Sequence, residues 1–238
     1  MPIPRKKQPE LMDDPTLDRQ LHLQALAGLR RINRWSFAVD ALWHSIRTFV
    51  HGQRLKTVRI LDLACGSGDV SLSLALRAAA EGIQVEVTGC DKSAIALAEA
   101  QQYAAHMVHP YPDTLRFIEL DVLQDELPAD HDIVMCSLFL HHLNESDAVQ
   151  LLRRMGMVTR HLVFVDDLRR SRSGYWLAWF GTRLLSRSPV VHFDGPVSVA
   201  GAFTVSEALA LAEQAGLHGA QIRRHWPQRF LLQWNRNS

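Results

Sequence analysis

Short apolar runs alternate with segments of helical periodicity through most of the chain. Five runs have the length of buried strands and cover residues 58–63, 84–90, 114–120, 132–138 and 161–165. Segments with apolar residues at helical spacing predict helices over residues 69–80, 93–106, 145–155 and 206–215. Strands that alternate with helices pair in parallel and carry helices on both faces of their sheet. Two further apolar runs, 220–224 and 230–234, follow the last helix and predict an antiparallel hairpin at the sheet edge.

Helices are also predicted ahead of the first strand. Asp14 followed by Pro15 is typical of an N-cap and a first helical position, so we expect a helix over residues 16–32. A second helix is expected over residues 36–50, and the extreme end of residues 1–14, a segment rich in proline and charge, is expected to be poorly ordered. The pattern as a whole predicts an α/β fold, a Rossmann-like seven-stranded, mostly parallel sheet with helices on both faces and an N-terminal helical extension.

The alternation of strands and helices breaks between residues 169 and 203. This segment holds several arginines and an aromatic block, Tyr175–Phe180, that includes two tryptophans. The block is explained as helix core, as a lid over an apolar substrate, or as a contact with an anionic membrane surface. The predicted organisation is an N-terminal helical extension over residues 1–55 and a main domain over residues 56–238, with a lid insertion after the fifth strand at about 169–203.

Composition narrows the class of protein. Hydrophobic residues make up 47% of the 238 and charged residues 21%, which is ordinary for a soluble domain. The formal net charge of +1 gives no drive toward nucleic acid. The basic start of the chain has no apolar segment behind it, so no secretory signal is expected and a cytoplasmic location is predicted. The three cysteines have no zinc-site spacing.

A glycine turn follows the first strand and is the sharpest motif. It reads Asp62-Leu63-Ala64-Cys65-Gly66-Ser67-Gly68-Asp69 and opens the next helix. Glycines accept positive φ and let a ligand approach the backbone, and open α/β sheets bind ligands at the carboxyl ends of their strands. A dinucleotide is disfavoured, because the third glycine of its fingerprint is missing and its pyrophosphate would meet Asp69. Asp62 and Asp69 favour a ligand with ammonium and sulfonium groups.

Two more strands end in acidic residues. Asp91, with Lys92 after it, follows the second strand, where a carboxylate is the usual acceptor for two ribose hydroxyls. Asp121 and Val122 follow the third strand, and an acid beside an apolar side chain suits an adenine. Each acid alone is more often a helix cap or a solvated residue. Their order at successive strand ends indicates a nucleoside site.

With these motifs the sequence resembles the class I S-adenosylmethionine-dependent methyltransferases over about residues 30–235. Within them it is most similar to the ubiquinone/menaquinone-type C-methyltransferases and related small-molecule methyltransferases. The resemblance implies S-adenosylmethionine as the cofactor, bound by Asp62, Ala64, Gly66, Gly68, Asp69, Asp91, Lys92, Asp121, Val122 and Ser137. The chain departs from the family pattern at Ala64, where the pattern has its first glycine. An alanine is small enough for this position if its φ is negative.

Methyl transfer to a phenolic or enolic acceptor also requires removal of a proton, and four residues are candidate bases. They are His141, His142, Asp166 and His192. His141 and His142 follow the fourth strand and are alternatively explained as residues that pack or cap the next helix. The pair Asp166-Asp167 ends the fifth strand, but no third acid is near in sequence, so no metal site is predicted.

The function that the sequence predicts is methyl transfer from S-adenosylmethionine to an apolar small molecule in secondary metabolism. The acceptor is expected to be phenol-, quinone- or polyketide-like, with oxygen slightly favoured over carbon. One alternative is a non-catalytic partner or sensor that only binds S-adenosylmethionine. Another is a protein or RNA methyltransferase, which the near-neutral charge disfavours. The sequence Ser137–Leu140 disfavours it too, because enzymes that methylate amide or base nitrogens have an Asn/Asp-Pro-Pro-Tyr-type tetrad at this position.

Overall fold

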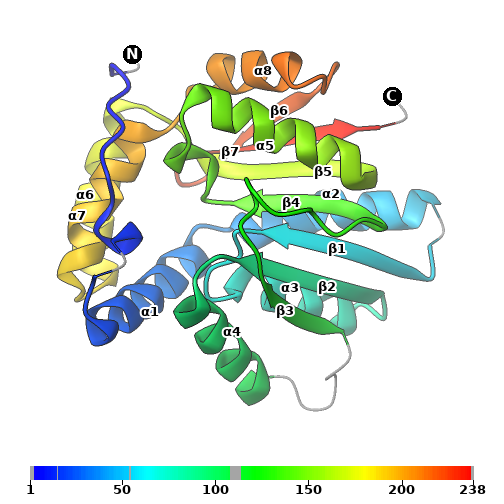
Figure 1. Cartoon of the computed structure of the whole chain (residues 1–238), viewed down its shortest axis with the longest axis horizontal. Coiled ribbons are helices and arrows are strands. Elements are labelled where there is room, and N and C mark those ends of the chain that lie inside the picture. The colour runs from blue at the N-terminus through cyan, green and yellow to red at the C-terminus, as the bar shows by residue number, and fades with distance from the viewer. Residues whose placement is uncertain (1–2, 15, 54, 108–113, 237–238) are drawn as a thin grey trace.

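A seven-stranded sheet forms the centre of the computed structural model, which describes residues 3–14, 16–53, 55–107 and 114–236 (Figure 1). Across the sheet the strands are β3 (Leu115–Glu119), β2 (Gln84–Asp91), β1 (Thr57–Leu63), β4 (His131–Ser137), β5 (Thr159–Leu168), β7 (Arg229–Asn235) and β6 (Gln221–His225). Strands β1 to β5 pair in parallel, whereas β7 lies antiparallel to both β5 and β6. The predicted fold, with a hairpin at one edge, is confirmed.

Helices cover both faces of this sheet. They are α1 (Arg19–Trp35), α2 (Ala38–Gln53), α3 (Asp69–Ala80), α4 (Ala94–Met107), α5 (Glu145–Val158), α6 (Arg172–Leu185), α7 (Pro189–Gly201) and α8 (Val205–Gln214), with short 3-10 turns η1 (Leu11–Asp13) and η2 (Leu140–His142). Leu61 and Leu63 of β1 pack with α5 and α8, and Val58 and Ile60 pack with α2 and α3. Alternate residues of a strand point to opposite faces, so each strand divides its apolar side chains between two cores.

The first helix begins later than the sequence pattern suggested. Its N-cap is Asp18, whose carboxylate accepts hydrogen bonds from the backbone of Gln20 and Leu21, so the predicted start at residue 16 is wrong. Asp14 instead accepts hydrogen bonds from the backbone and side chain of Thr16 in a local turn. Pro15 lies outside the described residues. Two residues with N-cap chemistry lie close together here, and only Asp18 binds the free N–H groups of the helix.

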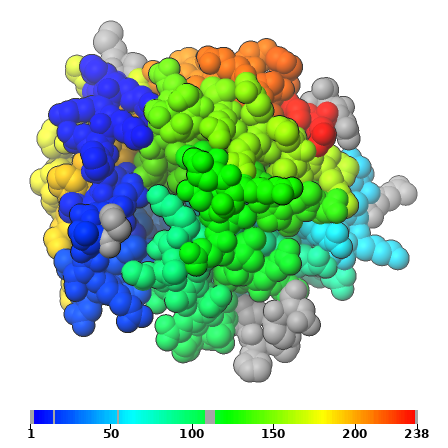
Figure 2. All heavy atoms as spheres, viewed as in Figure 1, coloured from blue at the N-terminus to red at the C-terminus, as the bar shows by residue number. Residues whose placement is uncertain are grey.

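Residues 3–14 are held against the rest of the chain by hydrogen bonds, and the extreme end, residues 1–2, lies outside the described residues. Arg5 donates hydrogen bonds to the carbonyl oxygens of Gly201 and Leu143 at 2.7 and 2.6 Å. The carboxylate of Asp194 in α7 accepts the backbone N–H groups of Leu11 and Met12. Figure 2 shows this segment, in dark blue, lying along the side of the molecule. The segment is therefore held at the edge where the parallel strands end.

The insertion after β5 folds into the two helices α6 and α7, which pack against α1 (Figure 1). One face of α6 carries Trp176, Phe180 and Leu184 into solvent, with exposed fractions of 56%, 61% and 85%. These side chains recur every four residues and form a stripe, so the interpretation of the aromatic block as helix core is wrong for them. No single helix in the described part of the chain is long and apolar enough to span a membrane; only α7 and α8 taken together, bent by 66° at their junction, reach that length and composition.

A buried ion pair lies between β5 and β7. Asp166 is 0% exposed and Arg229 is 2% exposed, and one guanidinium nitrogen contacts the carboxylate directly. The imidazole of His225 lies 2.6 Å from the other carboxylate oxygen. A buried charge that loses its partner is strongly destabilising. This pair therefore fixes the hairpin to the central sheet.

Replacing Arg229 by methionine is expected to lower the free energy of unfolding by about 3–5 kcal/mol, because Asp166 would lose its buried guanidinium partner. The control is Arg59→Met, which removes an exposed pair with Glu86 at 3.1 Å. An exposed pair contributes less than about 1 kcal/mol, so this variant should stay close to the unchanged chain. Urea unfolding followed by far-UV circular dichroism measures both. Equal losses in the two variants would contradict the assignment.

Candidate active site

The carboxyl ends of β1, β2 and β3 meet beside the glycine turn. The backbone N–H of Gly66 donates to the carboxylate of Asp91 at 2.8 Å, and the N–H of Cys65 donates to the carbonyl of Cys90 at 2.9 Å. The N–H of Leu120 binds the carbonyl of Asp91 at 3.0 Å, which ties the end of β3 to the same point. The structure thus brings the glycine turn and the second predicted acid into contact.

The glycine turn takes left-handed backbone conformations at alternate positions. The φ angles are +55° at Ala64, +53° at Gly66 and +66° at Gly68. The negative φ at which an alanine would fit the family pattern is therefore not observed at Ala64. An L-residue with a Cβ pays roughly 1–2 kcal/mol in this region, whereas glycine does not. A Cβ on Gly68 would also lie 2.6 Å from the ring of Phe117, so glycine is required there on two grounds.

Asp62 lies in β1 with its carboxyl group buried. One of its oxygens accepts the hydroxyl of Ser71 in α3, and the other has no hydrogen-bond partner in the described structure. Burial raises the pKa of Asp62 to about 7, with smaller contributions from Asp69 and Asp91. Because one oxygen has no partner and burial makes the negative charge costly, this carboxyl group is suited to bind a cation.

Asp69 begins α3 and is held by the first helix. The side-chain amide of Asn33 in α1 donates to its carboxylate at 3.0 Å. Burial raises the pKa of Asp69 as well, although the Asn33 hydrogen bond acts in the opposite direction. Asn33 also accepts from Arg229 at 3.4 Å, so α1 connects the glycine turn to the buried ion pair.

The remaining predicted cofactor residues lie around these. Asp121 follows β3 and accepts the backbone N–H of Leu123, and Val122 is 4% exposed in the core. Lys92 is exposed beyond the end of β2. Ser137 ends β4, and its hydroxyl donates to Asp166 at 3.2 Å. Ser137 therefore belongs to the buried ion-pair network as well as to the carboxyl edge.

The two histidines after β4 are surrounded by carboxylates. Nδ1 of His141 lies 2.7 Å from Asp167, and its Nε2 lies 3.5 Å from Glu10. His142 directs Nδ1 to Asp13 at 3.0 Å and Nε2 toward Glu10 at 3.8 Å. Burial by itself would lower the pKa of His141, but Asp167 and Glu10 outweigh it and raise that pKa to about 10.

The other candidate bases are engaged elsewhere. Asp166 contacts Arg229 and His225, whereas Asp167 faces His141, so the two neighbouring acids do not converge on one point. Nε2 of His192 in α7 lies 2.7 Å from the carbonyl oxygen of Ser186. The acids and histidines that were singled out thus divide into separate networks.

Sequence reasoning did not identify Arg229, Asn33 or Glu10. Arg229 directly precedes the apolar strand predicted over residues 230–234, and a cation at that position indicates a buried partner when an acid such as Asp166 ends a neighbouring strand. Asn33 lies between the two helices predicted over residues 16–32 and 36–50, and nothing in the sequence pattern marks it. Nothing in the sequence pattern marks Glu10, because its partners follow more than 130 residues later.

A protein-family comparison matches residues 60–161 to a methyltransferase domain. Among curated proteins, the ubiquinone biosynthesis O-methyltransferase of Chromobacterium violaceum is 29% identical over 160 residues, which cover 67% of this chain and 64% of that protein. The corresponding protein of Azotobacter vinelandii is 28% identical over 181 residues, or 73% of each chain. Relatives from Pseudomonas putida are matched over 51% of their length, so the chain spans about half to two thirds of several of these proteins.

Solved structures share the fold. The magnesium protoporphyrin IX methyltransferase of Synechocystis, with S-adenosylhomocysteine bound, superposes with a TM-score of 0.60 at 19% identity and covers 94% of this chain and 90% of its own. Mitomycin 7-O-methyltransferase superposes with a TM-score of 0.54 at 17% identity, over 75% of this chain and 49% of its own. At these identities the likeness concerns the fold.

The variant Ala64→Gly is expected to leave the melting temperature unchanged or to raise it, because glycine relieves the left-handed strain at φ +55°. The matched control is Ala98→Gly at an exposed position inside α4, where glycine should cost about 0.5–1 kcal/mol. Thermal melting of the two variants and the unchanged chain measures the difference. A loss in Ala64→Gly as large as in the helix control would show that Ala64 is not strained.

Proposed function

The chain contains a domain of the class I S-adenosylmethionine-dependent methyltransferase family, and on that premise we propose that it transfers the methyl group of S-adenosylmethionine to an oxygen of an apolar small molecule. The observation that carries this proposal is the junction of the glycine turn with Asp91 at the carboxyl edge, where Gly66 donates to the carboxylate at 2.8 Å. The relatives named O-methyltransferases support oxygen as the methylated atom.

The order of the strands supports the proposed cofactor site. β3, β2 and β1 are neighbours, and β4 lies on the other side of β1, so the direction of strand order reverses at β1. Ligands of open α/β sheets bind in the crevice at such a switch point. Asp62 and Asp69 would receive the charged methionine part, Asp91 with Lys92 the ribose, and Asp121 with Val122 the adenine. Ala64, Gly66 and Gly68 would let the ligand approach the turn, and Ser137 would close the crevice from β4.

Catalysis in this proposal is mainly positioning. S-adenosylmethionine supplies a methyl group on a sulfonium, and transfer needs the acceptor oxygen in line with that bond. Holding two reactants in such a pose supplies roughly 7–11 kcal/mol of the barrier. Both ring nitrogens of His141 and of His142 face carboxylates, and Asp166 and His192 have other partners, so we assign no general base among them. We therefore propose an acceptor that ionises readily by itself, such as a phenol or a quinol.

The acceptor would lie on the side of the insertion. A cavity of about 380 Å³ opens at this edge between the N-terminal segment, η2 and α7, with Glu10, His142 and Ser198 among its lining residues. This volume is in the range of small-molecule sites, and the mostly polar lining residues suit the oxygen-bearing end of an acceptor better than its apolar part. We further propose that residues 1–55 and the insertion at 169–203 together cover the acceptor. The exposed stripe of α6, with Arg183 stacked on Trp179 at 4.0 Å, would provide peripheral contact with a membrane that holds an apolar acceptor.

Thermal melting measures the binding of S-adenosylmethionine, and a labelled methyl group measures its transfer. S-adenosylmethionine should raise the melting temperature of the chain and NAD should not, because a ligand of the folded state stabilises it by mass action. Asp91→Asn should abolish that response. Glu86→Gln, at the amino end of the same strand, is the matched control and should keep it. With methyl-labelled S-adenosylmethionine, label should pass to phenols and quinols in extracts of apolar metabolites.

Other outcomes are equally informative. A thermal response to NAD in place of S-adenosylmethionine would contradict the cofactor assignment. Binding without transfer to any small molecule would favour the non-catalytic sensor, and transfer to protein or RNA would identify the other alternative. Label on carbon would correct the choice of oxygen.

Affinity for S-adenosylmethionine should rise with pH because of Asp62, whose pKa of about 7 lies above the usual value for Asp. A raised carboxyl pKa means that the free folded protein keeps the proton, and its stability falls as pH rises from about 4 to 7. A cationic ligand needs the ionised form, so its affinity should increase about tenfold between pH 6 and pH 8. Calorimetry at several pH values measures this. Asp62→Asn should bind weakly without the pH slope and Glu86→Gln should keep it; a slope that survives Asp62→Asn would exclude this origin.

A further inference from the structure

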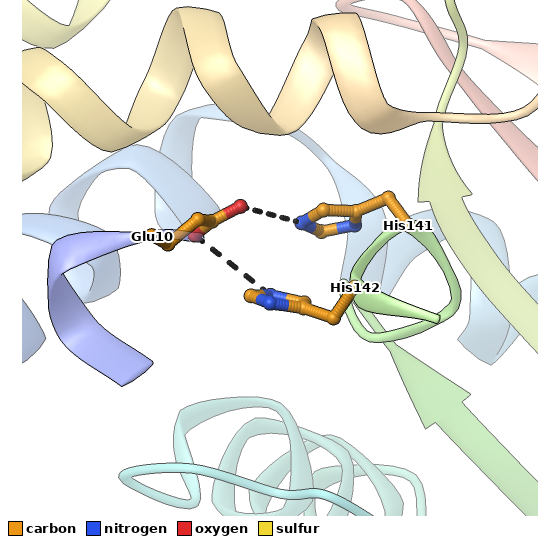
Figure 3. Close-up of side chains that lie close together, drawn as sticks. All are labelled: Glu10, His141 and His142. Atoms are coloured by element: carbon orange, nitrogen blue, oxygen red, sulfur yellow. Dashed lines mark ion pairs between the residues drawn. The ribbon is translucent and has the colours of Figure 1, made fainter. Parts of the chain in front are cut away.

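Three side chains from distant parts of the sequence converge beside the proposed acceptor cavity. Glu10 comes from the N-terminal segment, and His141 and His142 come from the η2 turn after β4. One ligand-type atom from each lies within 4.8 Å of the others. Figure 3 shows both imidazole rings projecting from the same turn toward the Glu10 carboxylate. We propose that Glu10, His141 and His142 bind a divalent transition-metal ion such as Zn²⁺.

The distances suit shared coordination better than direct pairing. Nε2 of His141 lies 3.5 Å from one Glu10 oxygen, and Nε2 of His142 lies 3.8 Å from the other. Both separations exceed those of ordinary N–H···O hydrogen bonds, which are 2.7–3.2 Å. Ligands 2.0–2.2 Å from a tetrahedral Zn²⁺ are about 3.4 Å apart. The three groups therefore need only small movements to surround one ion.

Each of the three groups is oriented by a further partner. Nδ1 of His141 binds Asp167 at 2.7 Å, and Nδ1 of His142 binds Asp13 at 3.0 Å. The hydroxyl of Ser198 donates to the Glu10 carboxylate at 2.6 Å. A metal-binding histidine commonly donates its second ring N–H to a carboxylate, which leaves Nε2 free for the ion. Both histidines show this arrangement.

Charge also favours a cation between these groups. Glu10, Asp13 and Asp167 carry three carboxylates around two imidazoles, and His141 is only 4% exposed. A bound ion requires neutral imidazoles and therefore displaces the proton that His141 carries; with neutral imidazoles and no ion the cluster would hold a charge of −3 in a poorly solvated place, which is costly. A divalent cation reduces that charge to −1 without placing two imidazolium rings, 4.3 Å apart, against each other.

The donor set indicates the class of ion. Two imidazole nitrogens with one carboxylate suit Zn²⁺ or Fe²⁺, whereas Mg²⁺ and Ca²⁺ prefer oxygen ligands. Three protein ligands leave a coordination position open, and the cavity of about 380 Å³ adjoins the cluster. An ion there would also fasten the N-terminal segment to the η2 turn, since Glu10 and the histidines belong to different parts of the chain.

The test uses the full chain without an affinity tag, stripped of metal by a chelator and titrated with Zn²⁺ in a calorimeter. We expect one ion per chain. Glu10→Gln and His142→Asn should each weaken binding at least tenfold, and Asp13→Asn, which removes only an orienting partner, should weaken it about 10–100-fold. His218→Asn is the matched control, because His218 also pairs with a glutamate, Glu213, at 2.6 Å, but on the exposed surface. It should bind like the unchanged chain.

Substitution with Co²⁺ provides a second readout, since visible absorption bands report its coordination geometry. A low-coordinate site with nitrogen and oxygen ligands should give bands that disappear in His142→Asn. Circular dichroism confirms that each variant is folded, and Asp13→Asn keeps all three ligands if another variant unfolds. Failure of the unchanged chain to bind Zn²⁺, or binding by Glu10→Gln and His142→Asn as tight as that of the unchanged chain, would overturn the proposal.

Discussion

The buried ion pair between Asp166 and Arg229 holds together the elements that form the functional edge. A carboxylate at 0% exposure persists there because a guanidinium and the imidazole of His225 contact it. The same guanidinium reaches Asn33 of α1, and Asn33 donates to Asp69 at the start of α3. The C-terminal hairpin and the glycine turn are therefore parts of one network, although more than 150 residues separate them. Any ligand at the turn contacts a structure that this ion pair has fixed in advance.

Two features of the glycine turn cost free energy in the protein without a ligand. Ala64 has a left-handed φ, and Asp62 is a buried acid whose second oxygen has no partner in the described structure. Such strain is typical of binding sites, where the surrounding fold holds groups in positions that they would not choose. A ligand with positive charge offsets the cost at Asp62 because it supplies the missing partner. A pyrophosphate would add to the cost, which is the physical reason for preferring a cationic nucleoside.

The fold could be predicted from the sequence because its signals are local. Apolar runs mark the strands, and the carboxyl ends of parallel strands must share one edge, so the glycine turn and Asp91 could be brought together without coordinates. The conformation of Ala64 could not be predicted, since it depends on how the turn is tied to β2. The roles of Glu10 and Arg229 could not be predicted either, because each acts through partners far away in the sequence. Contacts between residues far apart in the sequence produce no periodic pattern of apolar positions along the chain.

The N-terminal segment is part of the cover that we propose for the acceptor side. Its contacts, at Arg5, Glu10 and Leu11, are with the η2 turn and with α7 or its end. Hydrogen bonds thus join the N-terminal segment to α7, and a movement of the insertion alone would break them. The cover that we propose is therefore built from the N-terminal segment and the insertion, and an ion bound by Glu10, His141 and His142 would fasten the segment to the η2 turn.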